Sequence, residues 1–382
     1  MMNTYEFDKY ITNIDNIKDK LNEFGVCIIP NVLNNDECNI MIDNMWNYLE
    51  HITQKFIKPI NRNDNTSWRE FRKLYPKHSM LLQNWNIGHS ELVWNVRQNK
   101  KIINIFKKFY DTDELLVSFD GASFHFPPEI TKIGWFRDLW FHCDQSFLRN
   151  DFELVQGWIN AYDTNIGDAT LCILEKSHLY HKDFKDKYNK SDIFKQDWYK
   201  LSDDEKLFFI DKGCQEKRIL APRGSLILWD SRTIHCGVEP IKGRPQMNHR
   251  CCVYLCYQPK FLCKEKDIQK RIKAYENLRT TSHNVCKPKL FAINPRTYGG
   301  DLPDITQINK PNINYIGKQL IGYKLDRYET GDKNLKKIFN QHTSSQKSFK
   351  TLSLDKLMMK VDDIISTWNY QDELNKINNL FK

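Results

Sequence analysis

The chain of 382 residues carries 57 basic and 48 acidic side chains, which gives a formal net charge of +9 at pH 7. Residues 264–382 hold 22 Lys and Arg against 13 Asp and Glu, so the whole excess falls in this last third. A hydrophobic fraction of 40% excludes wholesale disorder, because burial of that much apolar surface can offset the chain entropy lost on folding. With no apolar run of about 18 residues, we expect no transmembrane helix.

The first ten residues contain acidic side chains and no apolar stretch, so they do not resemble a signal peptide. The sequence has 11 cysteines, an odd number, and we interpret them as reduced thiols of a cytoplasmic protein. Four of them, Cys251, Cys252, Cys256 and Cys263, lie close enough in sequence to suggest zinc or a disulfide. Burial as small apolar side chains is the interpretation we favour for these four.

The first hundred residues predict helices around one short strand. Apolar residues recur at helical spacing from Ile14 to Phe24, and Gly25 follows as a natural end of the helix. Val26–Ile29 predicts a strand, and a second helix is expected to begin after Asn35. Residues 55–100 are mixed, with three tryptophans that we expect in a helical layer: Trp68, Trp85 and Trp94.

From Leu115 onward the pattern changes to short strands. The predicted strands are Leu115–Phe126, Phe152–Tyr162, Ala169–Leu174, Lys217–Leu220, Ser225–Trp229 and Cys251–Tyr257. They follow one another too closely for crossover helices, which favours an antiparallel sandwich or barrel. A capping box that begins at Ser202 predicts a helix within an insertion at residues 182–216.

Beyond residue 264 the strand signals fade. Ile268–Leu278 predicts a charged helix, Lys287–Pro311 is irregular with four prolines, and Leu352–Phe381 again predicts a helix. The lysines of this region are interspersed with acids rather than massed in one run. We therefore favour a helical outer layer with solvated lysines over a nucleic-acid-binding tail.

The most informative segment for chemistry is Trp140–Gln145. In a strand, His142 and Asp144 point to the same face, where an imidazole nitrogen and a carboxylate oxygen form half of a facial metal site. A second histidine, His235, follows the buried-looking strand that starts at Ser225. Two histidines and one carboxylate with open positions are the ligands of non-haem Fe(II) oxygenases, although the same geometry can hold zinc or serve a metal-free cupin-like binder.

An oxygenase of this kind also needs a cation for the distal carboxylate of 2-oxoglutarate. Arg250 begins the apolar run that predicts the last strand, and its guanidinium can bind a carboxylate in a bidentate fork. Arg244, in the preceding loop, is the alternative anchor.

At these residues the sequence resembles the phytanoyl-CoA dioxygenase-like (PhyH-like) branch of the Fe(II)/2-oxoglutarate-dependent oxygenases. The resemblance covers roughly residues 20–260. The residues that carry it are Phe24-Gly25-Val26, Pro30, His142-Cys143-Asp144-Gln145, Gln156-Gly157-Trp158, Glu175-Lys176-Ser177-His178, Ala221-Pro222-Arg223-Gly224-Ser225, His235 and Arg250.

The resemblance implies a mainly β core with flanking helices: a double-stranded β-helix, or jelly-roll, of the cupin type. It also implies iron held by His142, Asp144 and His235, with 2-oxoglutarate anchored by Arg250 and O2 as the oxidant. By the same matching, Trp158 and Thr170 fall on strands that wall the 2-oxoglutarate pocket. Relatives that chlorinate have lost the carboxylate, so the resemblance favours hydroxylation or a related oxidation here.

Two departures from the family pattern concern the cosubstrate. The loop from His235 to Arg250 is longer than usual, which keeps Arg244 in contention, and Gly237 stands where the family often has a hydroxyl donor. The other histidines have less specific readings. We expect a structural role for His178 and ordinary polar roles for His125 and His181.

The expected organisation is a dioxygenase domain over residues 1–263 and a basic, mostly helical extension over 264–382, packed on or beside the barrel. Within the first, residues 115–260 form the β-helix core and residues 182–216 form a lid-like insertion. The expected activity is hydroxylation of a small or lipid-like substrate, with release of succinate and CO2. The alternatives are the same chemistry on a nucleic acid or protein, and a catalytically inactive jelly-roll that only binds.

Overall fold

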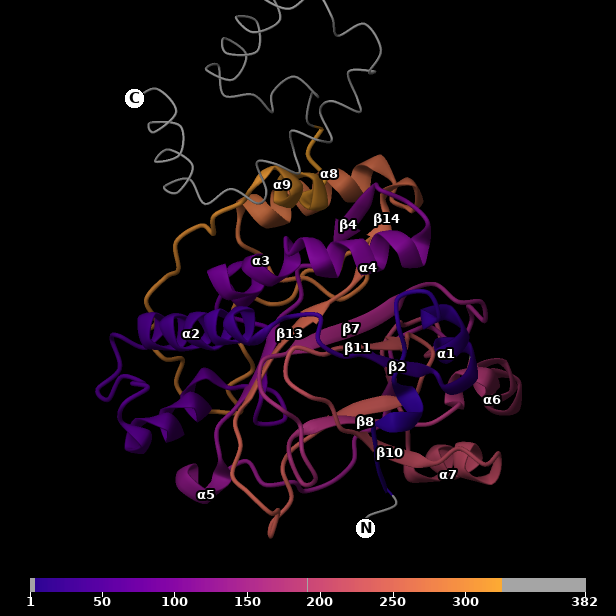
Figure 1. The fold of residues 1–382 in the computed structure, drawn as a ribbon, viewed down its shortest axis with the longest axis horizontal. Coiled ribbons are helices and arrows are strands. Elements are labelled where there is room, and N and C mark those ends of the chain that lie inside the picture. Colours follow the sequence, from indigo (N-terminus) through magenta and orange to yellow (C-terminus); the bar gives the residue numbers. More distant parts are fainter. Residues whose placement is uncertain (1–3, 191, 325–382) are drawn as a thin grey trace, which may run out of the picture. The chain divides into compact units, whose positions relative to one another are not determined.

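The computed structural model of the chain describes residues 4–190 and 192–324, all within one compact unit, Met1–Lys324. Within the described residues two six-stranded sheets form the centre of the molecule (Figure 1). The first sheet has the order β1 (Tyr5–Glu6), β10 (Glu216–Ile219), β8 (Thr170–Leu174), β12 (His235–Val238), β6 (His142–Cys143) and β9 (Tyr199–Lys200). The second has the order β2 (Val26–Ile29), β11 (Leu226–Asp230), β7 (Val155–Asn160), β13 (Arg250–Leu255), β5 (Ala122–His125) and β3 (Leu81–Leu82).

The chain passes back and forth between the sheets. Strands β5, β6, β7 and β8 alternate between the two sheets, and β10, β11, β12 and β13 do so again. Strand pairs are antiparallel except for β1 with β10. The predicted β core with flanking helices is therefore present, and its strands pair in the antiparallel manner that the short connections favoured.

Helices cover the second sheet on its outer side (Figure 1). They are α1 (Ile17–Phe24), α2 (Asn35–Ile52), α3 (Glu91–Arg97) and α4 (Lys100–Tyr110). Leu49, Trp94 and Phe106 from these helices share one buried cluster with Leu228 and Val253 of the strands. The main hydrophobic core thus lies between the helical layer and the second sheet.

The N-terminal elements follow their local signals closely. Helix α1 ends at Gly25, whose φ of 79° places it in the left-handed conformation. Helix α2 begins one residue from the expected place, because Asn34 and Glu37 form a reciprocal capping box.

Two expected strands are each divided in the structure. Residues expected as one strand from Leu115 form β4 (Leu115–Val117) and β5, and those from Cys251 form β13 and β14 (Tyr257–Pro259). Strand β4 pairs with β14 in a small separate sheet. Gly121, just before β5, packs so closely that an added Cβ would lie 1.8 Å from the carbonyl oxygen of Leu82. The chain changes sheets here, which alternation of apolar residues does not encode.

The expected insertion contains α6 (His181–Tyr188), the edge strand β9 and α7 (Asp203–Asp211). A second hydrophobic cluster includes Phe184, Phe194, Phe208 and Phe209 of this insertion together with Phe147. The insertion is therefore packed around aromatic side chains of its own.

The described part of the C-terminal third contains α8 (Glu265–Glu276) and α9 (Tyr315–Ile321), joined by a long irregular segment. The helix expected at Leu352–Phe381 lies outside the described residues. The division into residues 1–263 and 264–382 stays a prediction. Throughout residues 4–190 and 192–324, every helix is too short or too polar to cross a membrane.

Candidate metal centre

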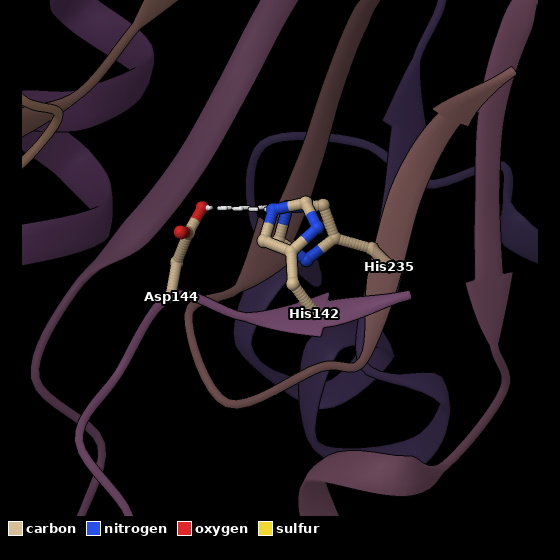
Figure 2. A group of neighbouring side chains, drawn as sticks. All are labelled: His142, Asp144 and His235. Carbon is tan, nitrogen blue, oxygen red and sulfur yellow. Dashed lines mark ion pairs between the residues drawn. The ribbon is translucent and has the colours of Figure 1, made fainter. Parts of the chain in front are cut away.

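His142, Asp144 and His235 meet where the two neighbouring strands β6 and β12 pair (Figure 2). His142 lies in β6 directly opposite His235 of β12, and Asp144 follows β6 in the bend after Cys143. The Nε2 atoms of His142 and His235 lie 3.6 and 3.5 Å from the same oxygen, Oδ2 of Asp144. No other group of three or more His, Cys, Asp and Glu residues in the described part of the chain is close enough to hold a metal ion.

Backbone carbonyls orient both imidazoles. Nδ1 of His235 lies 2.9 Å from the carbonyl oxygen of Thr233, and Nδ1 of His142 lies 3.4 Å from that of Trp140. A carbonyl only accepts hydrogen bonds, so each Nδ1 donates the proton and each Nε2 keeps its lone pair for a metal. The two ligand nitrogens are thus prepared without rearrangement of the side chains.

Gln156 of β7 orients the carboxylate. Its Nε2 donates to Asp144 Oδ2 at 2.8 Å, and its Oε1 accepts from the Trp229 indole at 2.7 Å. Burial acts to raise the pKa of the Asp144 carboxyl, but His283 and His142 beside it lower that pKa well below the ordinary value. Asp144 is therefore ionised, the state in which a carboxylate binds metal.

A stack of rings supports His142. Its imidazole lies 4.7 Å from the Trp140 ring at an angle of 4°, and Trp140 in turn stacks on His78 at 3.6 Å. The Trp140 indole donates to the Gly237 carbonyl at 2.8 Å. A Cβ on Gly237 would lie 3.3 Å from the Cε of Met80 and in ordinary contact, at 3.9 Å, with Trp140. Burial, and then His235, lowers the pKa of His142, which favours the neutral form that coordinates metals.

Arg250 extends from β13 of the second sheet toward the first. Its Nε donates to Ser123 Oγ at 2.9 Å, and its NH1 donates at 3.1 Å to the carbonyl of Ala169, directly before β8. The guanidinium carbon lies 4.3 Å from the centre of the Trp158 ring. The residue is only 4% exposed, yet its NH2 has no hydrogen-bond partner among the described residues. This buried cation therefore keeps one donor available for a ligand.

Arg244 is already paired with acids. It donates to both carboxylate oxygens of Glu129 at 2.8 Å and to Asp168 at 2.7 Å. Its donors are thus committed to two carboxylates of the protein.

The two other residues expected at the cosubstrate pocket lie on opposite sheets. Trp158 of β7 packs its ring against Arg250, as described above. Thr170 of β8 donates its hydroxyl to the carbonyl of Ile219 at 2.5 Å, which commits that proton to the sheet. Their role in cosubstrate binding stays a prediction.

Two further residues, His283 and Gln156, contact the metal cluster without having been predicted from the sequence to do so. His283 follows α8, and its Nδ1 lies 3.9 Å from Asp144 Oδ2. No motif in the sequence around His283 predicts this contact, because the distance between His283 and Asp144 depends on how the segment after α8 packs. Gln156 was noted as part of a family match, and the amide contact to Asp144 gives it an orienting role.

The remaining histidines and cysteines have ordinary surroundings. His178, His125 and His181 each place Nε2 near a backbone carbonyl oxygen, those of Asn22, Gly134 and Gln145 respectively. All 11 cysteines are buried free thiols.

Comparison with known proteins identifies relatives of the fold. No protein-family model matches the chain. Ava biosynthesis cluster protein O of Aspergillus versicolor is 25% identical over 280 residues, which cover 70% of this chain and 84% of that protein.

Three solved structures are similar. An inferred oxidoreductase from Salmonella typhimurium LT2 has a TM-score of 0.52 at 12% identity, over 82% of this chain and 86% of that one. GlcNAc Inducible Gene 2 (GIG2, DUF1479) from Candida albicans has a TM-score of 0.50 at 14% identity, over 94% and 86%. HygX from Streptomyces hygroscopicus, solved with nickel and 2-oxoglutarate bound, has a TM-score of 0.41 at 11% identity, over 65% and 88%. The first two show a shared fold.

Proposed function

We propose that this protein is an Fe(II)- and 2-oxoglutarate-dependent oxygenase of the phytanoyl-CoA dioxygenase-like type, which hydroxylates a small organic molecule. The observation that carries the proposal is a cluster of two buried histidines and one partly buried carboxylate, together with a buried arginine, Arg250, that has no acidic partner among the described residues. The cluster fits a non-haem iron ion that keeps open coordination positions, and the arginine fits the distal carboxylate of a dicarboxylic acid.

The order of the strands supports a double-stranded β-helix. Eight strands, β5–β8 and β10–β13, alternate between two facing sheets except at the β8–β10 step, where the insertion lies. We propose that this alternation brings the ligands of β6 and β12 and the arginine of β13 to one interior, as in a jelly-roll.

Ring contacts connect the two ends of the proposed site. Arg250 packs on Trp158, whose ring centre lies 5.3 Å from that of Trp229, and Trp229 lies 5.2 Å from His235. These indoles form an apolar wall between the guanidinium and the metal cluster. We propose that 2-oxoglutarate lies along this wall, with its distal carboxylate on the free NH2 of Arg250 and its other end toward the metal ligands.

In this proposal the protein holds and shields the reactants. His142, Asp144 and His235 would hold iron, and Gln156 would keep the carboxylate in place. Bound Fe(II) would supply oxidation by O2, coupled to conversion of 2-oxoglutarate into succinate and CO2. The indoles of Trp158 and Trp229, both 3% exposed, would exclude water from the cosubstrate.

The test is 2-oxoglutarate binding by the full chain with Fe(II) under anaerobic conditions, followed by its charge-transfer absorption. We expect Arg250→Ala to raise the dissociation constant of 2-oxoglutarate at least tenfold, because its carboxylate loses a charge-assisted partner. Binding of Fe(II) alone should be unchanged. Arg244→Ala is the matched control: it should lower the melting temperature, because Glu129 and Asp168 lose their partner, and leave 2-oxoglutarate binding unchanged.

Two results would contradict the proposal. An absorption band that survives His235→Ala would remove the metal assignment, and an Arg250→Ala protein with normal 2-oxoglutarate binding would remove the anchor. A chain that binds neither Fe(II) nor 2-oxoglutarate would instead be a jelly-roll binding protein.

A further inference from the structure

A large cavity opens beside the metal cluster. Its volume is about 590 Å³, within the range that suits a small-molecule ligand. Its walls come from separate parts of the chain: the 3-10 helix η3 (Asn65–Leu74) and the turn after it, the end of β5, the insertion, and the segment between α8 and α9. Six aromatic side chains line it: Trp68, Phe71, Tyr75, Phe126, Trp198 and Tyr298.

The charged residues of this cavity are all of one sign. Arg72, Lys77 and Arg296 line it, and no Asp or Glu of the described residues does. Lys77 donates to the Gln83 amide at 2.5 Å, whereas Arg72 and Arg296 have no ion pair or side-chain hydrogen bond within residues 4–190 and 192–324. The two guanidiniums therefore have donors available to an anion.

Two routes of ring contacts connect the cavity to the metal cluster. Trp198, contributed by the insertion, lines the cavity and has its ring centre 6.0 Å from that of His142. His78 also lines the cavity and begins the stack that runs through Trp140 to His142. A molecule in the cavity would thus be one layer of rings from the first metal ligand.

We infer that this cavity binds the substrate and that the substrate is a small planar aromatic molecule that carries a carboxylate or similar anionic group. That the bound molecule is the substrate rests on the proposed function, whereas its binding in the cavity does not. Flat apolar walls favour a ring system, which stacks on indole and phenol faces. The unpaired guanidiniums favour an anion, and a lining whose described residues include no acid disfavours cationic ligands.

The binding test uses 2-naphthoate as the probe and 2-naphthamide as its neutral counterpart of the same shape. Binding is measured on the full chain without metal or 2-oxoglutarate, by quenching of tryptophan fluorescence and by calorimetry. We expect the carboxylate to bind at least tenfold more tightly than the amide. The preference should disappear in the Arg72→Gln/Arg296→Gln double variant. Equal binding of the two probes, or an unchanged preference in the double variant, would overturn the inference.

Arg69→Gln is the matched control, because Arg69 is an exposed arginine of the same 3-10 helix that does not line the cavity. It should bind 2-naphthoate as the natural chain does; a loss equal to that of the double variant would show a general charge effect and overturn the inference. Trp198→Ala should weaken both probes equally, since it removes a stacking surface and no charge.

The position of the probe is tested with Mn(II), which substitutes for Fe(II) and relaxes nearby protons in magnetic resonance. We expect Mn(II) to broaden the 2-naphthoate signals in the natural chain and not in His235→Ala. If Mn(II) binds but leaves the signals sharp, the cavity is not the substrate site and the inference fails. If Mn(II) does not bind at all, the proposed function fails, while the metal-free comparison of naphthoate and naphthamide still decides the ligand class.

Discussion

His283 brings a third imidazole to the metal cluster from outside the sheets. Its Nδ1 lies 3.9 Å from Asp144 Oδ2, and its buried Nε2 has no hydrogen-bond partner in the described part of the chain. Residues that contact metal ligands orient them and tune their affinity. His283 is thus placed to support Asp144 through a contact with its carboxylate.

We expect His283→Ala to weaken metal binding about tenfold, as is usual when a neighbour of a ligand is removed. The measurement is competitive titration of the full chain with Mn(II) and a chromophoric chelator. His51→Ala is the control, since the imidazole of His51 hydrogen-bonds the Gln307 carbonyl and no metal ligand among the described residues. Unchanged affinity in His283→Ala would show that the contact with Asp144 does not support metal binding.

Glu239 supplies a pH-dependent contribution to stability that is separate from the metal cluster. It is 7% exposed, and burial, followed by repulsion from Asp138, raises its pKa from 4.5 to about 7. The folded state therefore binds this proton more tightly than the unfolded state does. The corresponding stability is fully present below about pH 4.5 and is lost as the pH rises through 7.

Glu239→Gln should remove this dependence. We expect the variant to gain up to about 3 kcal/mol in free energy of unfolding relative to the natural chain at pH 8, and little at pH 4.5. Urea unfolding at the two pH values measures the difference between the proteins. A difference that does not change with pH would show that Glu239 ionises normally in the folded chain.

At the scale of elements, Arg271 joins α8 to three other segments. It is fully buried and donates to the carbonyls of Val117, Val285, Leu320 and Ile321. These carbonyls belong to β4, to the segment after α8, and to α9. One guanidinium thus satisfies the ends of elements that are far apart in sequence.

Arg271→Met should cost about 3–5 kcal/mol of unfolding free energy, because buried carbonyls lose their donors while the apolar volume is nearly kept. Urea denaturation checks this value. Lys266→Met is the comparison on the same helix, where an exposed side chain is exchanged and a change within about 0.5 kcal/mol is expected. If Arg271→Met lowers the free energy of unfolding no more than Lys266→Met does, the carbonyls must be hydrogen-bonded to water in the variant.

The elements also show what the sequence could predict. Strands β7, β8 and β11 were predicted within a few residues, because alternation and short connections are local properties. Strand β6, in contrast, covers only His142–Cys143 of the expected segment, so Asp144 is held by Gln156 and not by a ladder. His142 and Asp144 could be selected because their spacing is local, and His235 because it follows a predicted strand. Trp198 and Arg296 could not be selected, since only packing brings them to one cavity.

At the scale of the whole molecule, most of the excess positive charge can be assigned to one segment of the chain. Residues 264–324 carry 12 Lys and Arg against 5 Asp and Glu, while residues 325–382 carry 10 against 8. Most of the excess thus belongs to the segment that contains α8 and α9, and one of its arginines, Arg296, lines the cavity. Part of the positive charge is therefore positioned to attract an anionic ligand rather than only to solvate an outer layer.

The late position of His283 and Arg296 in the chain has a consequence for synthesis. A ribosome has made all three proposed metal ligands by residue 235 and the last long strand by residue 255. His283, which contacts Asp144, and Arg296, which lines the cavity, follow 28 or more residues later. A nascent chain that ends between residues 255 and 283 would contain all three proposed metal ligands, but it would lack His283 and the part of the cavity wall that includes Arg296. We therefore expect the site to be completed only after the strands have been made, when the segment that contains His283 and Arg296 packs beside them.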